Sequence, residues 1–312
     1  YFHMFTSIFS LSANVLSKRR LRLSVGVCGC MACLALTTAC GNGKSETDAQ
    51  TLQFASPSAR YDSTAIHLAL RPTADCFPFY YAQRTGIYRR LGLTLELHTY
   101  RGQLDCDTAL VGRWMDGGYA DAQRLQEPHM KRAGLNVKST GVDFWQLAVS
   151  GPLRVKDASK LSGRLVAVAR ESAESAYLDE ILKESKVRTE DVFRPQVNDV
   201  ALRAQMLAHR QVDAAMLCWP YTSVALAHAD RILLSQPRSE SGARFVVKKR
   251  GGREHLDTKA LDLLKRGYEM AVDSMKVAPR DRVSAILQRD YGVETSIADT
   301  LHLEFGGFFR KR

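Results

Sequence analysis

The chain has 312 residues, of which 45% are hydrophobic and 25% are charged, which is the balance of a folded globular protein and not of a disordered or fibrous one. Its formal net charge is +11, but the basic residues are spread along the chain, and no basic helix with interleaved aromatic residues indicates a nucleic-acid-binding module. We therefore expect no nucleic acid among its partners.

The first 39 residues have the pattern of a signal peptide. Their four basic residues lie within 18–22, and the first acidic residue is Glu46. The uncharged stretch 23–39 is too short and too rich in small residues for a membrane span of roughly 20 apolar residues. A basic region, an apolar region and a small-residue cleavage site are the three parts of a signal peptide, which we predict over residues 1–39.

Residues 37–40, Thr-Thr-Ala-Cys, resemble a bacterial lipobox, in which a small residue precedes a cysteine that is acylated and becomes the new N-terminus. The departure is Thr37, where leucine is usual. We predict a lipoprotein with palmitate on Cys40, held to a bacterial membrane by a polar tether over 40–64, with its folded part outside the cytoplasm. The alternative is a plain signal peptide or a short anchor with an unmodified Cys40.

Removal of residues 1–39 takes +4 from the net charge of +11 and leaves +7. This excess indicates a solvated basic surface, or alternatively a surface that meets an anionic membrane or partner. Three cysteines follow Cys40, at Cys76, Cys106 and Cys218, without CxxC or zinc spacing. We expect no metal and no cofactor, and free thiols at Cys76 and Cys106 in preference to a disulfide between them.

The remaining chain alternates between strand and helix patterns. Apolar runs and strict alternation predict strands at 66–70, 93–99, 117–120, 145–150, 165–169, 193–197, 212–217 and 244–248. Helical patterns follow at 79–91, 105–111, from 121, 175–186, 199–208, 221–228 and from 257 to the end, with Pro279 at a helix start. Asp105 and Asp199 are candidate N-caps. This alternation predicts an α/β fold with mixed, mainly parallel sheets.

Three segments resemble one protein family. Residues 77–88 match a pattern xPFYxAxxxGxY, and residues 91–97 read LGLTLEL after it. Residues 161–172 read LSGRLVAVARES, and residues 211–221 read QVDAAMLCWPY. These segments resemble the periplasmic solute-binding proteins of ABC transporters, of the type that includes the alkanesulfonate, nitrate and thiamine-pyrimidine-precursor binders.

The resemblance implies a two-lobed periplasmic-binding-protein fold of type II with a ligand cleft between the lobes. Residues 65–145 and 240–312 would form lobe 1, and residues 146–239 would form lobe 2. The expected partners are a small-molecule ligand and the permease and ATPase subunits of an importer, and we expect a monomer. Closure would bend the crossing strands near 142–151 and 235–245.

In open α/β sheets ligands bind beyond the carboxyl ends of the strands, so the loops after each strand hold the candidate ligand-binding residues. These are Thr73, Asp75, Cys76, Phe77, Gln103, Asp105, Asp107, Tyr119, Asp121, Arg170, Ser172, Ser175, Trp219 and Tyr221. Each has a plainer alternative, because Asp and Ser side chains also cap helices and aromatic rings also fill cores.

The ligand class stays open between two chemistries. Four carboxylates beside aromatic rings favour a heteroaromatic amine such as a thiamine pyrimidine precursor. The helix that starts near Ser172, together with Arg170, suits an anion such as a sulfonate. Two other functions are weaker alternatives, a ligand-binding module of a surface sensor and an enzyme on the same fold. No nucleophile elbow, HExxH or phosphate loop supports an enzyme, so we assign no catalytic residue.

Overall fold

A computed structural model describes residues 62, 64–141, 144–237, 242–250, 253–254 and 256–301. The predicted signal peptide, the lipidation at Cys40, most of the tether and parts of both predicted hinges lie outside these residues. Within them, no helix combines the length and the hydrophobicity that crossing a membrane requires.

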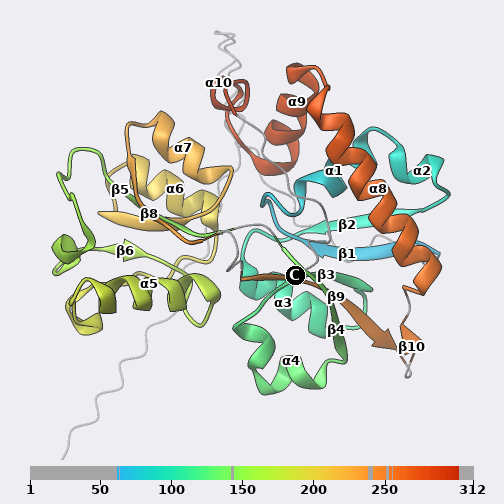
Figure 1. Ribbon diagram of the computed structural model, residues 1–312, viewed down its shortest axis with the longest axis horizontal. Helices are drawn as coiled ribbons and strands as arrows, with labels where there is room; N and C mark the ends of the chain where they lie inside the picture. Colours follow the sequence, from blue (N-terminus) through green and yellow to red (C-terminus); the bar gives the residue numbers. More distant parts are fainter. Residues whose placement is uncertain are drawn as a thin grey trace, which may run out of the picture. The chain divides into compact units, whose positions relative to one another are not determined.

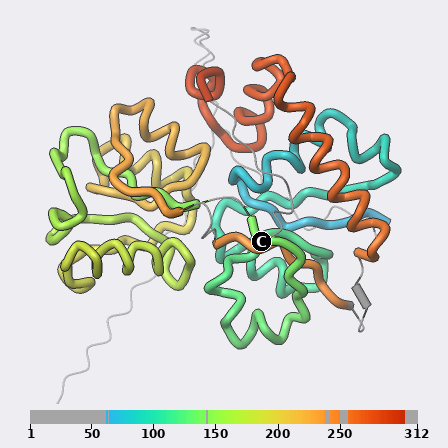
Figure 2. The backbone as a smooth tube through the Cα atoms, in the orientation of Figure 1, coloured from blue at the N-terminus to red at the C-terminus, as the bar shows by residue number. Residues whose placement is uncertain are grey.

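The first sheet has six strands in the order β10-β9-β3-β1-β2, with β4 also paired to β9 (Figure 1). The strands are β1 (Ile66–Leu70), β2 (Leu95–Thr99), β3 (Gly117–Asp121), β4 (Leu135–Thr140), β9 (Ala243–Arg250) and β10 (Arg253–Glu254). Strand β9 comes from the C-terminal half of the chain, and Figure 2 shows it as an orange segment among green ones. The first sheet is therefore built from two distant stretches of the chain.

The second sheet has four strands in the order β6-β7-β5-β8. They are β5 (Gln146–Val149), β6 (Val166–Ala167), β7 (Ala214–Leu217) and β8 (Arg231–Ser235). Among the described strands of both sheets, three pairs are parallel and five are antiparallel. The sheets are mixed as predicted, but "mainly parallel" is wrong, because β5 and β9 bring the chain across from the other sheet and run against their neighbours.

Helices cover both faces of the first sheet. They are α1 (Phe77–Arg84), α2 (Ile87–Arg90), α3 (Gln103–Val111), α4 (Pro128–Arg132), α8 (Thr258–Lys276), α9 (Arg280–Tyr291) and α10 (Thr295–Ala298). Side chains of a strand alternate between its faces. Leu68 and Leu70 accordingly pack in the large core with α1, α8 and α9, whereas Ala69 packs in a smaller core with α3 and α4.

The second sheet has its own core, formed with α5 (Ala173–Glu184), α6 (Val200–Ala208) and α7 (Tyr221–Ala227). Short 3-10 turns occupy residues 124–126, 158–161 and 189–191. The predicted cap of α6 is confirmed, since the Asp199 carboxylate accepts from the backbone N–H groups of Ala201 and Leu202.

Several predicted elements differ from the structure. The helix predicted over 79–91 is two helices, because Gly86 adopts a left-handed φ of 71° that ends α1 and starts α2. Gly102, and not Asp105, occupies the N-cap of α3. The strand predicted over 193–197 is reduced to isolated bridges at Phe193 and Gln196. Strands β4 and β8 were not predicted.

Two histidines on β1 and β2 form a hydrogen-bonded pair near the start of the described chain. The Nε2 atom of His67 lies 2.8 Å from the carbonyl oxygen of Asp62, which can only accept, so Nε2 carries the hydrogen. The Nδ1 atom of the same ring lies 3.0 Å from Nε2 of His98, so the two rings share one hydrogen. One of these two nitrogens must lack a hydrogen for the bond to form, so both rings cannot be protonated at once while it holds.

We expect this pair to make stability depend on pH. Burial, then the charge of His67, lowers the pKa of His98 below its usual 6.5. The unfolded chain therefore binds the proton more readily, so the stabilising effect is complete above pH 6.5 and is lost as the pH falls through the lowered pKa. Urea unfolding between pH 5 and pH 8 should show this loss. His98→Gln keeps an N–H donor for His67 and should flatten the slope; an unchanged slope would contradict the assignment.

Candidate functional site

Side chains from the strand ends and helices around both sheets form two adjoining sets. The first set, called the polar junction below, consists of Arg71, Asp107, Asp121, Arg124, Trp145, Glu174 and Arg203. The second set, called the aromatic junction, consists of Phe77, Tyr80, Trp219, Tyr221 and Tyr291. Most members are buried, and they come from elements that are far apart in the sequence.

Asp121 connects the end of β3 to the start of α5. One carboxylate oxygen accepts from the backbone N–H groups of Gln123 at 2.8 Å and Arg124 at 3.1 Å. The other accepts from the N–H of Ala173 at 2.8 Å, which is the first residue of α5. The side chain of Asp121 thus joins an element of the first sheet to an element of the second.

Asp107 lies beside Asp121, inside α3, and is fully buried. Its carboxylate accepts from Nε of Arg124 at 2.7 Å and from Nε2 of Gln103 at 2.5 Å. Burial, then the charge of Asp121, raises the pKa of Asp107 to about 7, although Gln103 and Arg124 act in the opposite direction. Burial also raises the pKa of Asp121. The polar junction therefore holds carboxylates that are costly to ionise without cations nearby.

Cations are indeed present. Arg203 is fully buried and its Nη1 atom lies 2.5 Å from a carboxylate oxygen of Glu174. The guanidinium carbons of Arg203 and Arg71 lie 5.5 Å and 5.9 Å from the centre of the Trp145 ring, which is within reach of cation–π attraction. Burial raises the pKa values of Asp107, Asp121 and Glu174, and the positive charge of Arg71 opposes that rise at all three. Arg71 therefore acts on every carboxylate of the polar junction.

In the aromatic junction, rings meet edge to face. Phe77 lies 5.7 Å from Trp219 and 5.4 Å from Tyr291, measured between ring centres. The hydroxyl of Tyr221 donates to the carbonyl of Tyr291 at 3.0 Å, and the hydroxyl of Tyr291 donates to the carbonyl of Thr73 at 2.8 Å. The structure thus brings together four of the predicted residues, Thr73, Phe77, Trp219 and Tyr221.

The other predicted residues have varied surroundings. Asp75 and Cys76 are buried, and Tyr119 packs its ring against Phe79 and Phe245 in the core of the first sheet. Ser172 caps α5, since its hydroxyl accepts from the N–H of Ser175. Asp105 and Arg170 are exposed, and Arg170 is hydrogen-bonded to Gln196, outside both junctions.

Of the described cysteines, Cys76 and Cys106 are free, buried thiols, as the sequence predicted, and Cys218 is buried as well. Burial raises the pKa of Cys76 to about 12, so the thiolate is strongly disfavoured. Among the residues that the structure describes, no three His, Cys, Asp or Glu side chains lie close enough to hold a metal ion.

Several junction residues were missed from the sequence. Arg71 directly follows β1, so the rule of strand-end loops would have selected it together with Thr73. Arg203 and Tyr291 lie within helices, and only the folded chain shows that they face the site. The sequence pattern carries no signal for Arg124 or Trp145 beyond their places near the ends of strands.

Solved structures of low sequence identity share the fold. The periplasmic aliphatic sulphonate binding protein SsuA from Escherichia coli has a TM-score of 0.61 at 16% identity, over 76% of this chain and 77% of that one. The alkanesulfonate-binding protein SsuA from Xanthomonas axonopodis pv. citri, bound to MOPS, has a TM-score of 0.60 at 16% identity, over 76% and 83%. The nitrate-binding protein NrtA from Synechocystis PCC 6803 has a TM-score of 0.60 at 14% identity, over 75% and 68%.

These likenesses confirm the predicted α/β fold of the periplasmic binding proteins. A comparison with curated proteins found no match in sequence. The sequence model of the family described as "NMT1/THI5 like" matches residues 73–247, which is more than half of the chain and includes most residues of both junctions. The chain therefore belongs to the NMT1/THI5-like family.

Proposed function

We propose that this protein is an extracytoplasmic solute-binding protein that captures a small molecule between two lobes and delivers it to an ABC importer. The observation that carries the proposal is the meeting, in the polar and aromatic junctions, of side chains from strand ends and helices that belong to two different sheets. Open α/β sheets bind ligands at the carboxyl ends of their strands, and Arg71, Asp121 and Trp219 lie at or just beyond the ends of β1, β3 and β7. The proteins of similar fold, described as binders of sulfonates and nitrate, support the same role.

The proposed mechanism is closure of lobe 1 (65–145 and 240–312) onto lobe 2 (146–239) around the ligand. The contacts between elements of the two sheets include single polar interactions. Examples are the hydrogen bond from the N–H of Ala173 to Asp121 and the ion pair of Arg101 with Asp199 at 3.3 Å. Such contacts can break while each core stays intact. A ligand that bridges both lobes would select the closed form.

A lipid on Cys40 would hold the protein where the permease and ATPase subunits of the importer lie. One acyl chain gives only marginal anchoring, so the several chains of a bacterial lipoprotein matter here. Mass spectrometry of the membrane fraction should find Cys40 acylated at the N-terminus of the mature chain; an unmodified Cys40 in a soluble fraction would remove this part of the proposal.

We favour a heteroaromatic amine, such as a thiamine pyrimidine precursor, as the ligand. The half-buried ring of Trp219, which packs against the buried rings of Phe77 and Tyr291, offers a surface for a flat ligand. The carboxylates of the polar junction can accept its amine hydrogens. The alternative is a sulfonate or another anion, which Arg71 and the start of α5 would attract. If the protein were instead the ligand-binding module of a surface sensor, the ligand site would be the same. Only the identification of a signalling partner would distinguish that role from transport.

Catalysis is the weaker alternative because the described thiols in and near the site are poor nucleophiles. The pKa values of Cys76 and Cys106 are both raised, first of all by burial. The proposed function therefore rests on binding. A thermal-shift screen of the mature protein against vitamins, amines and sulfonates tests it, because a ligand of the folded state raises the melting temperature. If no solute of these classes raises it, the proposed function is wrong.

Trp219→Ala should weaken binding of a solute found in that screen by about tenfold, the loss expected for one aromatic contact. Isothermal titration calorimetry measures the effect. Trp114→Ala is the matched control, since Trp114 precedes β3, is 59% exposed and has no part in either junction. If both variants bind like the wild type, the ligand does not contact the aromatic junction.

A further inference from the structure

We propose that Asp121 occupies the position that an anionic ligand would take at the start of α5, and thereby makes this protein reject sulfonates and nitrate. The inference rests on the proposed function and concerns the charge of the ligand at that same site. It assigns to Asp121 a role in specificity, and it selects the amine-bearing class over the anionic one.

The first step concerns the donors at the start of α5. Anions bind at such positions because the first backbone N–H groups of a helix have no partner within it. Here the N–H of Ala173 donates to Asp121, and the N–H of Ser175 donates to the hydroxyl of Ser172. That hydroxyl in turn donates to the carbonyl of Ala169 at 2.6 Å. A sulfonate bound at the N–H of Ala173 would take the place that Asp121 occupies in this structure, and would therefore oppose closure.

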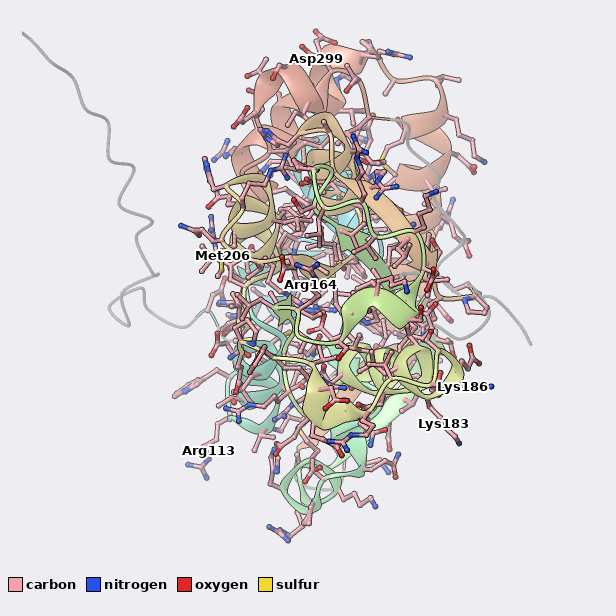
Figure 3. All side chains as sticks on the ribbon, turned by 90° about the vertical axis from the view of Figure 1, so that its left-hand side faces the viewer. Arg113, Arg164, Lys183, Lys186, Met206 and Asp299 are labelled. Atoms are coloured by element: carbon pink, nitrogen blue, oxygen red, sulfur yellow. The ribbon has the colours of Figure 1, made fainter. Side chains whose placement is uncertain are left out.

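The second step concerns the helix dipole. Helix α5 has 12 residues, with its positive end at Asp121. At the other end, Lys183 and Lys186 project outward from the fold (Figure 3). A carboxylate at the start and cations at the end are the arrangement that the dipole favours, so the charge that an anionic ligand would supply is already present.

The third step concerns how firmly Asp121 is held. Its carboxylate accepts three backbone N–H groups, of Gln123, Arg124 and Ala173, and only 4% of the residue is exposed. Two of these donors belong to its own loop, so the side chain is oriented toward α5 before any contact across the site forms. A ligand anion would gain one N–H bond and would lie beside a buried carboxylate that cannot move away freely.

The fourth step is the charge of the surroundings. Three buried guanidinium groups belong to the polar junction, and three buried carboxylates oppose them there; buried Asp75 adds a fourth carboxylate from the loop after β1. The guanidinium groups of the polar junction are therefore already matched by carboxylates, which leaves no surplus positive charge to attract an anion. A second anion in this region would add to the repulsion, whereas an ammonium or amidine group would balance it.

The test uses nitrate and ethanesulfonate as probes of the mature protein, with affinity measured by calorimetry. The wild type should bind neither probe measurably. Asp121→Ser leaves room and frees the N–H of Ala173, so it should bind at least one probe at least about tenfold more tightly than the wild type. Asp157→Ser is the matched control. Asp157 also accepts a hydrogen bond from a backbone N–H, that of Ser159, but it is exposed and belongs to neither junction. It should behave like the wild type.

Two results would overturn the inference. One is tight binding of either probe by the wild type with Asp121 in place. The other is a folded Asp121→Ser variant, shown by a cooperative thermal transition, that gains no affinity for either probe. Neither result contradicts the proposed solute-binding function, provided that an amine or another solute still binds. Conversely, the anion experiment can succeed even if no physiological solute is found, so the two proposals fail independently.

Discussion

Glu174→Met should destabilise the folded protein by about 3–5 kcal/mol, because it leaves the guanidinium of Arg203 charged and buried without its carboxylate. The two side chains are at most 2% exposed, and the pair is 2.5 Å long, so water cannot replace the lost partner. The Trp145 ring near Arg203 offsets only part of this cost, since a cation–π contact contributes less than a buried ion pair.

The double variant Glu174→Met, Arg203→Met is the control. With both charges removed, most of the lost stability should return, since well-packed hydrophobic residues often replace a buried ion pair without loss. A residual cost of about 1 kcal/mol should remain, because the N–H of Ala169 donates to Glu174 in the wild type and loses its acceptor. Urea unfolding of the wild type, the single variants Glu174→Met and Arg203→Met, and the double variant completes the cycle. If the double variant is no more stable than the single one, the pair is not the source of the effect.

The same pair illustrates what the sequence could not predict. The strict alternation of residues 93–99 and the alternating order of strands and helices indicated the α/β fold, because both depend on short-range patterns. Glu174 and Arg203 are separated by 29 residues, and nothing at either position indicates a buried charge. Their contact depends on how α5 and α6 pack, which no local pattern records.

Strands β4 and β8 were missed for a related reason. Strand β8 is mostly exposed or half-buried and lies at the edge of its sheet, and its apolar run is only Ile232, Leu233 and Leu234. Strand β4 has polar residues on both faces and is held by its pairing with β9, which lies about a hundred residues further along the chain. Pairing with a distant strand overrides weak local propensity.

The sequence indicated which loops approach the candidate site, but not which of their side chains face it. The rule of strand-end loops selected Asp107, Asp121, Trp219 and Tyr221, all of which belong to the two junctions. The same rule also selected Asp105 and Arg170, which are exposed, because it locates a loop but not the direction of a side chain. The bond from Ala173 to Asp121 crosses from one sheet's elements to the other's, and so only the folded chain reveals it.

Gly118→Ala should destabilise the protein by more than about 4 kcal/mol, which is in the range of exceptional single substitutions. Gly118 lies on β3, paired to Ala69 of β1, with a φ of 156°. An added Cβ atom would lie 2.1 Å from the carbonyl oxygen of Ala69. Neither strand can yield easily, because β1 also pairs with β2 and β3 also pairs with β9.

Gly92→Ala separates this clash from the strain of an unfavourable φ. Gly92 has a φ of 76°, and an added Cβ atom would meet nothing within 4 Å, so this variant should lose only about 1 kcal/mol. Chemical unfolding compares the two, and equal losses would mean that strain alone acts. The difference matters for the site because Asp121 is the last residue of β3, three positions beyond Gly118. A displaced β3 would move that carboxylate away from α5, so a Gly118→Ala chain that still folds should also lose the wild-type rejection of ethanesulfonate.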